Sequence, residues 1–578
     1  MNSIQRRIAE LSPEKRQLLD ILLRERGAES AWGSAEYVEP RTPVEQTLAE
    51  IWAKTLGLPR VGVYDNFFEL GGDSIQSIQI LAKARHAGIH LNANQMFAHP
   101  TIAELAELAT AADSRPGSTV DPVGPVPLTP IQAWFFEQRI ASPQHWNQAV
   151  LLECGPEVHS DLLSTAFRHL VRHHDALRLR WQNPTIGAGQ TVAADESAEF
   201  FLTVDAPDDI NAVLKTAHET LDLVNGPIFR AVFVRTPEGR NQLLVVAHHL
   251  AVDAVSFRIL FDDLETVCRQ VLAGESPRLP ARTSSFREWA LRLSDYAASR
   301  EIRNQIPVWE ARSHPSPMPL DCADGENLEG SVDELLVSLP PEETEWVRQR
   351  AAAILRSQVD DMLLAALYSA LLAWGIENPL IDVEGHGRLD RLPGLDLSRT
   401  VGWFTTIAPL SLQIAPDTTP AALLQRVKEV RRITPDGRIG FGLLRYLSRD
   451  SAVKDRLQNL PQADVSFNYL GQFDHVLPAG ALFRPLDFAP GPLYSPQAKR
   501  RYVLQVTARI QDGQLRLSCY YSRNLHRRET MDRLCGQILV ALRQICNNDA
   551  PPEPEPVRPA DFPLAGLSQQ DLDRLVEI

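Results

Sequence analysis

The sequence predicts a small all-α helix bundle followed by a much larger region of mixed α/β structure. Apolar residues recur at helical spacing between residues 43 and 110, a proline-rich segment follows, and short apolar strands then alternate with amphipathic helices. The chain has 578 residues, which leaves room for several domains. Because the roughly 420 residues from 127 onwards are too many for one core, we expect this region to form two lobes.

The composition is that of an ordinary globular protein and excludes several classes. Hydrophobic residues make up 44% and charged residues 23%, and the net charge of −15, without a dense Lys/Arg block, argues against nucleic-acid binding. The N-terminus lacks the apolar core of a signal peptide, and the longest apolar run, residues 362–376, is too short to span a bilayer. Six scattered cysteines without a CxxC pair predict buried thiols in a reducing cytosol, and neither a disulfide framework nor a metal site.

Both ends of the chain have the pattern of a short helix set apart by a linker. Residues 11–27 read as a helix, with Ser12 as its cap and Gly27 as its stop, so that residues 1–40 form this helix and a linker. At the other end, residues 549–578 comprise a proline-rich linker and a short acidic amphipathic helix over 568–576. We expect both helices to dock onto partner proteins; a frayed end is the alternative.

The unit from residue 41 to 110 contains three predicted helices. The first has an apolar face over residues 44–51, and the second has an apolar stripe over residues 75–81. The third opens with a capping-box pattern, in which Thr101 is followed three residues later by a glutamate. A unit of this size with three such stripes predicts a helix bundle.

Residues 111–126 contain three prolines and predict a semi-rigid tether between this bundle and the larger region. Beyond it, "LLVVA" at 243–247 reads as a buried strand, and residues 255–272 read as an amphipathic helix. We divide the larger region into an N-lobe, 127–300, and a C-lobe, 301–548.

The segment "ELGGDSIQSIQIL" places a serine behind two glycines and an aspartate at the start of an amphipathic helix. By itself this pattern is typical of a helix cap. Ser74 or Asp73 could accept the amide hydrogens of the first turn, with Gly71 and Gly72 making the bend before it. The rest of the chain decides whether the serine has a further role.

The segment "VVAHHLAVDAVSFRIL" runs from a predicted buried strand into His248, His249 and Asp253, and then into a helix. Side chains at the end of a strand are held rigidly and can still face a cleft, where a neutral imidazole can act as a general base near pH 7. Because adjacent strand residues point to opposite sides, only one histidine can face a substrate. Asp253 could orient the loop through a buried ion pair, with a partner that is not visible from sequence. A pair of ordinary core histidines is the alternative.

These two motifs together resemble a known family. The HHxxxD pattern after a strand resembles the signature of the condensation-domain superfamily of nonribosomal peptide synthetases, which shares a two-lobed fold with chloramphenicol acetyltransferase. The "LGGDSIQSIQIL" segment resembles the phosphopantetheine attachment site of a peptidyl carrier protein. The resemblance implies a small all-α carrier bundle followed by a two-lobed α/β domain of the chloramphenicol-acetyltransferase-like type, over residues from about 40 to 547.

Within this superfamily the sequence is more similar to epimerization domains than to domains that form peptide bonds. An aspartate before the serine, Asp73 here, resembles carriers that feed epimerization domains. One departure is Phe257, where the family usually has tryptophan, and we expect it to change packing and not chemistry. The segments that resemble the family's motifs are, in chain order, "PLTPIQAWFFEQ" (127–138), "HWNQ" (145–148), "RHHDALRLRW" (172–181), "VEGHGR" (383–388), "VGWFTTIAPL" (401–410), "RIGFGLLRYL" (438–447) and "VSFNYLGQFD" (465–474).

The resemblance implies a site for each step of an epimerization. Ser74 would be the attachment point of 4′-phosphopantetheine, at a helix N-terminus that favours the phosphate. A thioester makes the α-hydrogen of the attached residue acidic, and two groups on opposite sides would then remove and return the proton. By the resemblance these groups are His249 and Glu384, without pyridoxal or metal.

The resemblance also implies the surroundings of these two groups. Burial would raise the pKa of Glu384 towards the working range. Tyr469 and Asn468 resemble further active-site residues that stabilise the enolate oxygen or relay a proton, and His248 and Asp253 complete the motif structurally. The alternative for Glu384 is a structural ion pair with Arg388.

We therefore expect an L-to-D epimerase of aminoacyl or peptidyl thioesters in nonribosomal peptide biosynthesis, located in the cytoplasm. Two alternatives stay open: a condensation domain that forms an amide bond, and a non-catalytic module that only docks carriers. The expected partners are a phosphopantetheinyl transferase, an adenylation protein that charges the carrier in trans, and a downstream condensation domain that accepts D-residues. Neither nucleic acid nor a membrane is expected as a partner.

Overall fold

The computed structural model describes residues 37–547, apart from short internal stretches. The predicted helix over residues 11–27 and the predicted linker and helix over 549–578 lie outside the described residues, as does Asp73. The internal stretches that are not described are residues 69, 73, 92–94, 97–98, 112–119, 206, 208, 238, 311–314, 352–354, 356, 389–391, 393, 413, 415–417, 435–438, 473–479 and 487–488.

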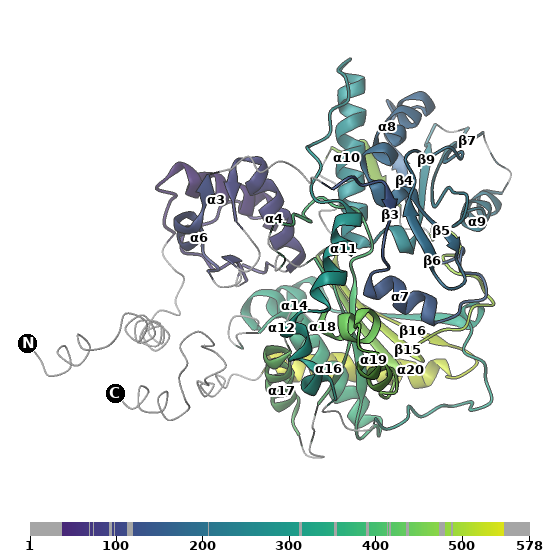
Figure 1. Cartoon of the computed structure of the whole chain (residues 1–578). Helices are drawn as coiled ribbons and strands as arrows, with labels where there is room; N and C mark the ends of the chain where they lie inside the picture. The colour runs from purple at the N-terminus through teal and green to yellow at the C-terminus, as the bar shows by residue number, and fades with distance from the viewer. Residues whose placement is uncertain are drawn as a thin grey trace, which may run out of the picture.

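Over the residues that the structure describes, the first unit is a helix bundle whose α3, α4 and α6 correspond to the three apolar stripes (Figure 1). A capping box starts the first helix: the Thr42 hydroxyl accepts from the Glu45 amide, and the Glu45 carboxylate accepts from the Thr42 amide. Thr101 caps the third helix, where its hydroxyl accepts from the Glu104 amide. The core contains Trp52, which is fully buried. The elements are α3 (Pro43–Leu56), α4 (Ser74–His86), β1 (Ile89–His90), α6 (Ile102–Leu108) and β2 (Thr110–Ala111).

The N-lobe is built on a five-stranded sheet with the strand order β14-β4-β9-β8-β7. Helices α8 and α10 pack on one face of this sheet and α9 on the other, because alternate residues of the strands enter two different apolar clusters. The elements are β3 (Gly124–Pro125), α7 (Pro130–Glu137), β4 (Asn147–Cys154), α8 (Ser160–His173), η2 (Asp175–Arg178), β5 (Leu179–Asn183), β6 (Ala188–Val192), β7 (Phe201–Asp205), α9 (Ile210–Glu219), β8 (Phe229–Arg235), β9 (Gln242–His248), η3 (His249–Ala251), α10 (Ala254–Leu272) and α11 (Phe286–Tyr296).

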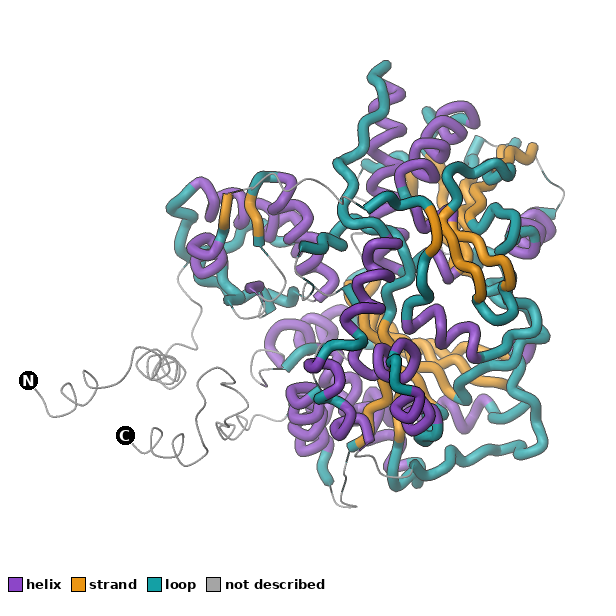
Figure 2. The backbone as a smooth tube through the Cα atoms, in the orientation of Figure 1, coloured by secondary structure: helices purple, strands orange, loops and turns teal. Residues whose placement is uncertain are grey.

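The C-lobe is built on a six-stranded sheet with the strand order β10-β16-β15-β13-β11-β12, and α16, α17 and α20 contribute to the apolar core on one of its faces. Figure 2 shows the strands of the large domain in orange with helices in purple around them. Its elements are α12 (Arg300–Arg303), α13 (Ile306–Glu310), η4 (Glu329–Ser331), β10 (Val332–Ser338), α14 (Pro341–Glu345), η5 (Trp346–Ala351), α16 (Val359–Ala373), β11 (Leu380–Gly385), β12 (Thr406–Ser411), α17 (Pro420–Ile433), α18 (Ile439–Gly442), η7 (Leu443–Leu447), α19 (Ser451–Gln458), β13 (Val465–Gln472), β14 (Phe483–Pro485), β15 (Leu504–Gln511), β16 (Gln514–Ser522) and α20 (Arg528–Cys546).

The boundaries drawn from the sequence differ from the structure at two places. Strand β3, inside the predicted tether, pairs with β6, so regular structure of the larger domain begins before residue 127. The lobes also exchange segments: β14 pairs with β4, and apolar residues of the ranges 392–404 and 439–457 are buried in the core of the N-lobe. A single cut at residue 300 therefore does not separate the two cores, because apolar surface is buried regardless of its position in the sequence.

Helix α16 contains most of the longest apolar run and is a buried core helix, as predicted. Among the helices that the structure describes, none combines the length and the apolar character needed to cross a bilayer. Five of the six cysteines are buried free thiols, while Cys322 is exposed.

Candidate active site between the two lobes

His248 and His249 lie at the end of β9 and are held in different ways. The His248 side chain is fully buried; its Nε2 lies 2.7 Å from the Pro143 carbonyl oxygen, and its Nδ1 accepts from the Leu250 amide at 3.1 Å. Burial lowers the pKa of His248 to about 3. Both ring nitrogens are therefore occupied in a neutral ring, which agrees with a structural residue.

His249 has the properties that a general base needs. Its Nδ1 donates to the Val252 carbonyl oxygen at 2.9 Å, which leaves the lone pair of the neutral ring on Nε2. The Gln148 side-chain amide lies 2.8 Å from that Nε2, and the Trp403 ring packs on the imidazole with a centroid distance of 4.2 Å. Burial lowers the pKa of His249, and nearby Asp253 opposes this only in part. The ring is therefore neutral and able to take a proton.

The structure supplies the partner of Asp253 that the sequence could not show. Arg388 Nη2 donates to Asp253 Oδ1 at 3.1 Å, and both side chains are buried. Asp253 also caps α10 through the Ser256 amide and accepts from the Phe404 amide at 3.1 Å. The pair therefore joins the HHxxxD loop of the N-lobe to the EGHGR segment of the C-lobe.

Glu384 lies on β11 and does not pair with Arg388, which bonds instead to Asp253 and to nearby carbonyl groups. Its partner is Asn468, whose Nδ2 donates to Glu384 Oε2 at 2.7 Å. Burial, and then the charge of Asp382, raise the pKa of Glu384 to about 7. The alternative of an ion pair between Glu384 and Arg388 is therefore not seen, and the carboxyl group can both hold and release a proton near neutral pH.

Tyr469 follows Asn468 on β13 and is partly buried against the core of the C-lobe. Successive residues of a strand face opposite sides, and Tyr469 has the parity of Phe467, on the side where both pack against the core of the C-lobe. Asn468 has the opposite parity and reaches Glu384. Of the two FNYLG residues predicted for the site, Asn468 contacts the Glu384 carboxylate, and the role of Tyr469 stays a prediction.

Trp146 and Tyr494 connect the surroundings of His249 with those of Glu384. The His249 amide donates to the Trp146 carbonyl oxygen at 2.9 Å, and the Trp146 ring packs on Tyr494 with a centroid distance of 4.5 Å. Burial, together with the charges of Glu329 and Glu384, raises the pKa of Tyr494. Tyr494 thus connects the surroundings of His249 with those of Glu384, and no motif of the sequence pointed to it.

Trp403 is a second residue that sequence reasoning did not assign a role, although it lies in the quoted VGWFTT segment. Its indole is 3% exposed, and its Nε1 finds no hydrogen-bond partner among the residues that the structure describes. Besides packing on His249, it lines a cavity of about 950 Å³ together with α7, η7 and Asp382. Trp403 thus lies between His249 and this cavity.

The loop before α4 fits a phosphopantetheine group on the carrier. Helix α4 begins at Ser74, so the unpaired amides of its first turn are available to a phosphate there. Gly71 has a φ of 84°, and an added Cβ would collide with the Arg348 side chain; at Gly72 it would collide with the Phe67 ring. Glycines allow this close approach, and the Arg348 guanidinium, which is ion-paired with Glu345, lies beside the loop.

The carrier lies against the larger domain with α4 on the facing side (Figure 1). Gln76 on α4 donates to Gln472 at 3.1 Å, and Arg85 forms an ion pair with Asp396. Gln472 is the last residue of β13, and its carbonyl oxygen accepts from Arg258 of α10 at 3.0 Å. The carrier helix therefore contacts the strand that holds Asn468.

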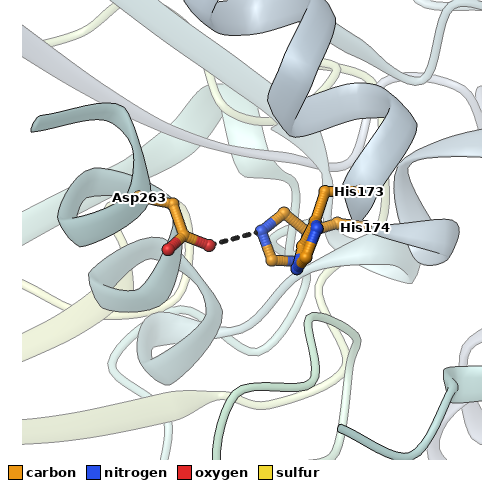
Figure 3. Close-up of side chains that lie close together, drawn as sticks. All are labelled: His173, His174 and Asp263. Atoms are coloured by element: carbon orange, nitrogen blue, oxygen red, sulfur yellow. Dashed lines mark hydrogen bonds and ion pairs between the residues drawn. The ribbon is translucent and has the colours of Figure 1, made fainter. Parts of the chain in front are cut away.

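A separate cluster in the N-lobe has ligand atoms close enough for a metal ion. Figure 3 shows His173, His174 and Asp263, whose ligand atoms lie within 4.8 Å of one another. The Asp263 carboxylate already accepts from His174 Nε2 at 2.9 Å and from Arg399. Because a guanidinium occupies the second carboxylate oxygen, the cluster forms an ion-pair network that ties the end of α8 to α10.

Two family models match the chain. The phosphopantetheine attachment site matches residues 46–109, and the condensation domain matches residues 124–561. Among curated proteins, one of the linear gramicidin synthases from Brevibacillus parabrevis is 40% identical over 558 residues, which cover 93% of this chain and 7% of the relative. Chondramide synthase cmdD from Chondromyces crocatus is 40% identical over 563 residues, 94% of this chain and 14% of the relative. The chain thus spans a small part of these relatives.

Solved structures agree on the fold. The crystal structure of the epimerization domain from the third module of tyrocidine synthetase B matches with a TM-score of 0.69 and 30% identity, over 75% of this chain and 99% of that domain. The condensation domain from Monacolin K polyketide synthase MokA matches with a TM-score of 0.60 at 16% identity and shows the fold alone. The predicted two-lobed fold is confirmed. The chain therefore belongs to the condensation-domain family of nonribosomal peptide synthetases, and a phosphopantetheine carrier domain precedes its condensation-type domain.

Proposed function

We propose that this condensation-type domain inverts the α-carbon of an aminoacyl or peptidyl thioester that is bound to its own carrier, with Ser74 as the attachment point. The conclusion rests above all on Glu384, a buried carboxyl group on the C-lobe whose pKa is raised to about 7 and whose partner is an amide, not a cation. A proton-transfer pair with His249 needs such a group on the opposite lobe. The similarity to the tyrocidine epimerization domain supports the same activity.

The phosphopantetheine arm supplies a thioester, which acidifies the α-hydrogen, and a tether long enough to reach the lobe interface. The protein residues do the rest. His249 holds a lone pair on Nε2, and Glu384, whose pKa is raised to about 7, can hold or release a proton near neutral pH. One group removes the α-proton, the electron pair of the broken C–H bond moves into the thioester carbonyl, and the other group delivers its proton to the opposite face. After each inversion the two groups have exchanged protonation states.

Asn468 keeps the Glu384 carboxyl in position through its 2.7 Å hydrogen bond, and Asp253 with Arg388 keeps the His249 loop against the C-lobe. None of these three positioning residues needs to exchange a proton with the substrate. We further infer that a phosphopantetheinyl transferase modifies Ser74, that an adenylation protein charges the carrier, and that a downstream condensation domain takes the D-product.

The direct test loads Ser74 with L- or D-aminoacyl pantetheine in heavy water and follows the D:L ratio and α-deuterium by chiral analysis and mass spectrometry. The wild-type chain should approach the same mixture from either enantiomer while deuterium enters the α-position. His249→Ala should lose both processes. Glu384→Gln should stop inversion, because an amide cannot exchange the proton, and can leave exchange from the face that His249 serves.

Glu329→Gln is the matched control, because burial also raises the pKa of Glu329 to about 6 although it lies outside the proton-transfer pair; it should keep inversion. Robust inversion by the His249→Ala, Glu384→Gln double variant would refute the two-group mechanism. Amide formation with an added aminoacyl carrier, without a change in the D:L ratio, would instead identify a condensation domain. No turnover of any kind, with intact carrier docking, would identify a docking module.

A further inference from the structure

We propose that Gln148 controls the proton-accepting state of His249: its amide donates to the Nε2 lone pair in the free protein, and turns to accept from Nε2–H once His249 has taken a proton. The proposal rests on the proposed role of His249 as a base. Gln148 is then a positioning residue, which acts through the imidazole and not on the substrate.

The contacts of His249 fix the tautomer of its neutral ring. Its Nδ1 lies 2.9 Å from the Val252 carbonyl oxygen, and a carbonyl oxygen can only accept. Nδ1 therefore carries the hydrogen, and the neutral ring has its lone pair on Nε2. The Gln148 Nε2 atom, 2.8 Å away, is a donor to that lone pair.

Strand pairing fixes this contact. Gln148 on β4 lies opposite Ala247 on β9, and His249 begins η3 directly after this strand, where its Nε2 lies 2.8 Å from the Gln148 amide nitrogen. The imidazole itself is held by Val252 along its edge and by Trp403 over its face, with a centroid distance of 4.2 Å. The ring can therefore not turn without losing both contacts.

The Gln148 amide, in contrast, can turn. Over the residues that the structure describes, its single hydrogen bond is the one to His249, so rotation of the amide breaks no other. The side-chain amide carries a donor NH₂ group and an acceptor oxygen, and a rotation of about 180° around its last side-chain bond exchanges their positions. The same side chain can thus match either state of the imidazole.

Proton transfer makes this turn necessary. When the substrate C–H bond breaks, its electron pair remains in the thioester and the proton forms an N–H bond at His249 Nε2. Because Nε2 has a single in-plane lone pair, the Gln148 N–H must leave it before the substrate C–H can approach, and the Nε2–H that then forms is met by the amide oxygen instead of a second donor. Of the charged or titratable groups around the imidazole, Asp253 is paired with Arg388 and His248 is kept neutral by burial. Gln148 is therefore the group that responds when Nε2 gains a proton.

The test measures the imidazole directly. The full chain, kept without substrate by Ser74→Ala, is labelled with ¹⁵N-histidine, and ring-nitrogen NMR follows His249 against pH. The wild type should show the Nδ1–H tautomer. Gln148→Glu, which only accepts, should raise the pKa of His249 by about 1 to 3. Gln148→Met, which removes the donor to the lone pair, should raise it by about 0.5 to 1.

Two controls separate this effect from packing. Gln132→Met removes another buried glutamine, which donates to the Leu250 carbonyl oxygen at 3.3 Å without touching the imidazole, and should leave the pKa of His249 unchanged. His248, in the same spectra, should not move in either Gln148 variant. In the loaded chain, Gln148→Glu should lose deuterium exchange at pH 7 and regain it at higher pH.

A proton on Nε2 in the neutral wild-type ring would overturn the proposal, and this measurement needs no variant at Gln148 to fold. An unchanged titration of His249 in Gln148→Glu would overturn it as well. The titration of His249 can be measured whether or not the protein turns over substrate. If the protein inverts its substrate but the pKa of His249 does not respond to substitution of Gln148, only this inference is refuted. If the pKa responds as expected but no inversion occurs, only the proposed function is refuted.

Discussion

Asp382→Asn should lower the pKa of Glu384 by about 1 and leave its surroundings intact. Asp382 lies two residues before Glu384 on β11, and the two side chains face the same side of the sheet. Its carboxylate accepts from the Tyr502 hydroxyl at 2.9 Å, a bond that the oxygen of asparagine can keep. The substitution thus removes the charge and can keep this hydrogen bond.

The size of the effect follows from the spacing of the strand. Two residues along a strand are about 7 Å apart, and two charges at that distance interact by about 2.4 kcal/mol at an effective dielectric constant of about 20, equivalent to about 1.8 in pKa. Burial is the larger cause of the rise of the Glu384 pKa from 4.5 to about 7. The share of Asp382 must therefore be less than half of that rise, which leaves about 1.

The assay is an infrared pH titration of the protonated carboxyl band, assigned by its loss in Glu384→Gln. Tyr502→Phe is the matched control, because it removes the same hydrogen bond and keeps the charge; its titration should stay where the wild-type titration is. An unchanged or raised midpoint in Asp382→Asn would show that the carboxylate of Asp382 is not what acts on Glu384.

The pH dependence of the free energy of unfolding provides an independent measure of the raised pKa of Glu384. Because the folded-state pKa of Glu384 is raised, the folded chain binds more protons than the unfolded chain between pH 4.5 and about 7. Stability relative to Glu384→Gln should therefore fall as the pH rises through this window, by up to about 3 kcal/mol. In Asp382→Asn the fall should be smaller and end at lower pH.

Two further predictions concern contacts between parts of the chain. Arg388→Met leaves Asp253 buried without its counter-charge and should cost about 3–5 kcal/mol, visible as a lower unfolding temperature, whereas the Asp253→Asn, Arg388→Met pair should recover most of the loss; equal loss in both would show that the arginine matters through packing. Arg85→Glu breaks the ion pair with Asp396 and should reduce the docked carrier population by about 2- to 5-fold in a distance measurement between fluorophores on the two domains. The reversed pair, Arg85→Glu with Asp396→Arg, should restore it; failure to do so would show that this ion pair does not orient the carrier.

Local patterns in the sequence were sufficient for the carrier and for the order of the domains. The helical stripes of residues 43–110, the cap at Thr101 and the strand that ends at His248 depend on neighbours in the chain, and the structure confirms each of them. The prediction that the two histidines differ in exposure to a substrate comes from strand alternation, whereas in the structure His248 ends β9 and His249 begins η3. These features follow from backbone periodicity, which is written in a single stretch of sequence.

Contacts between distant segments were decided only by the tertiary structure. The partner of Asp253 is Arg388, 135 residues away, and this pairing leaves Glu384 to Asn468. Gln148 was visible in the HWNQ segment, but its contact with His249 arises from the pairing of β4 with β9. The physical reason is that a motif fixes which groups are present, whereas burial and strand register fix which group faces which, and thereby the pKa and the proton of each.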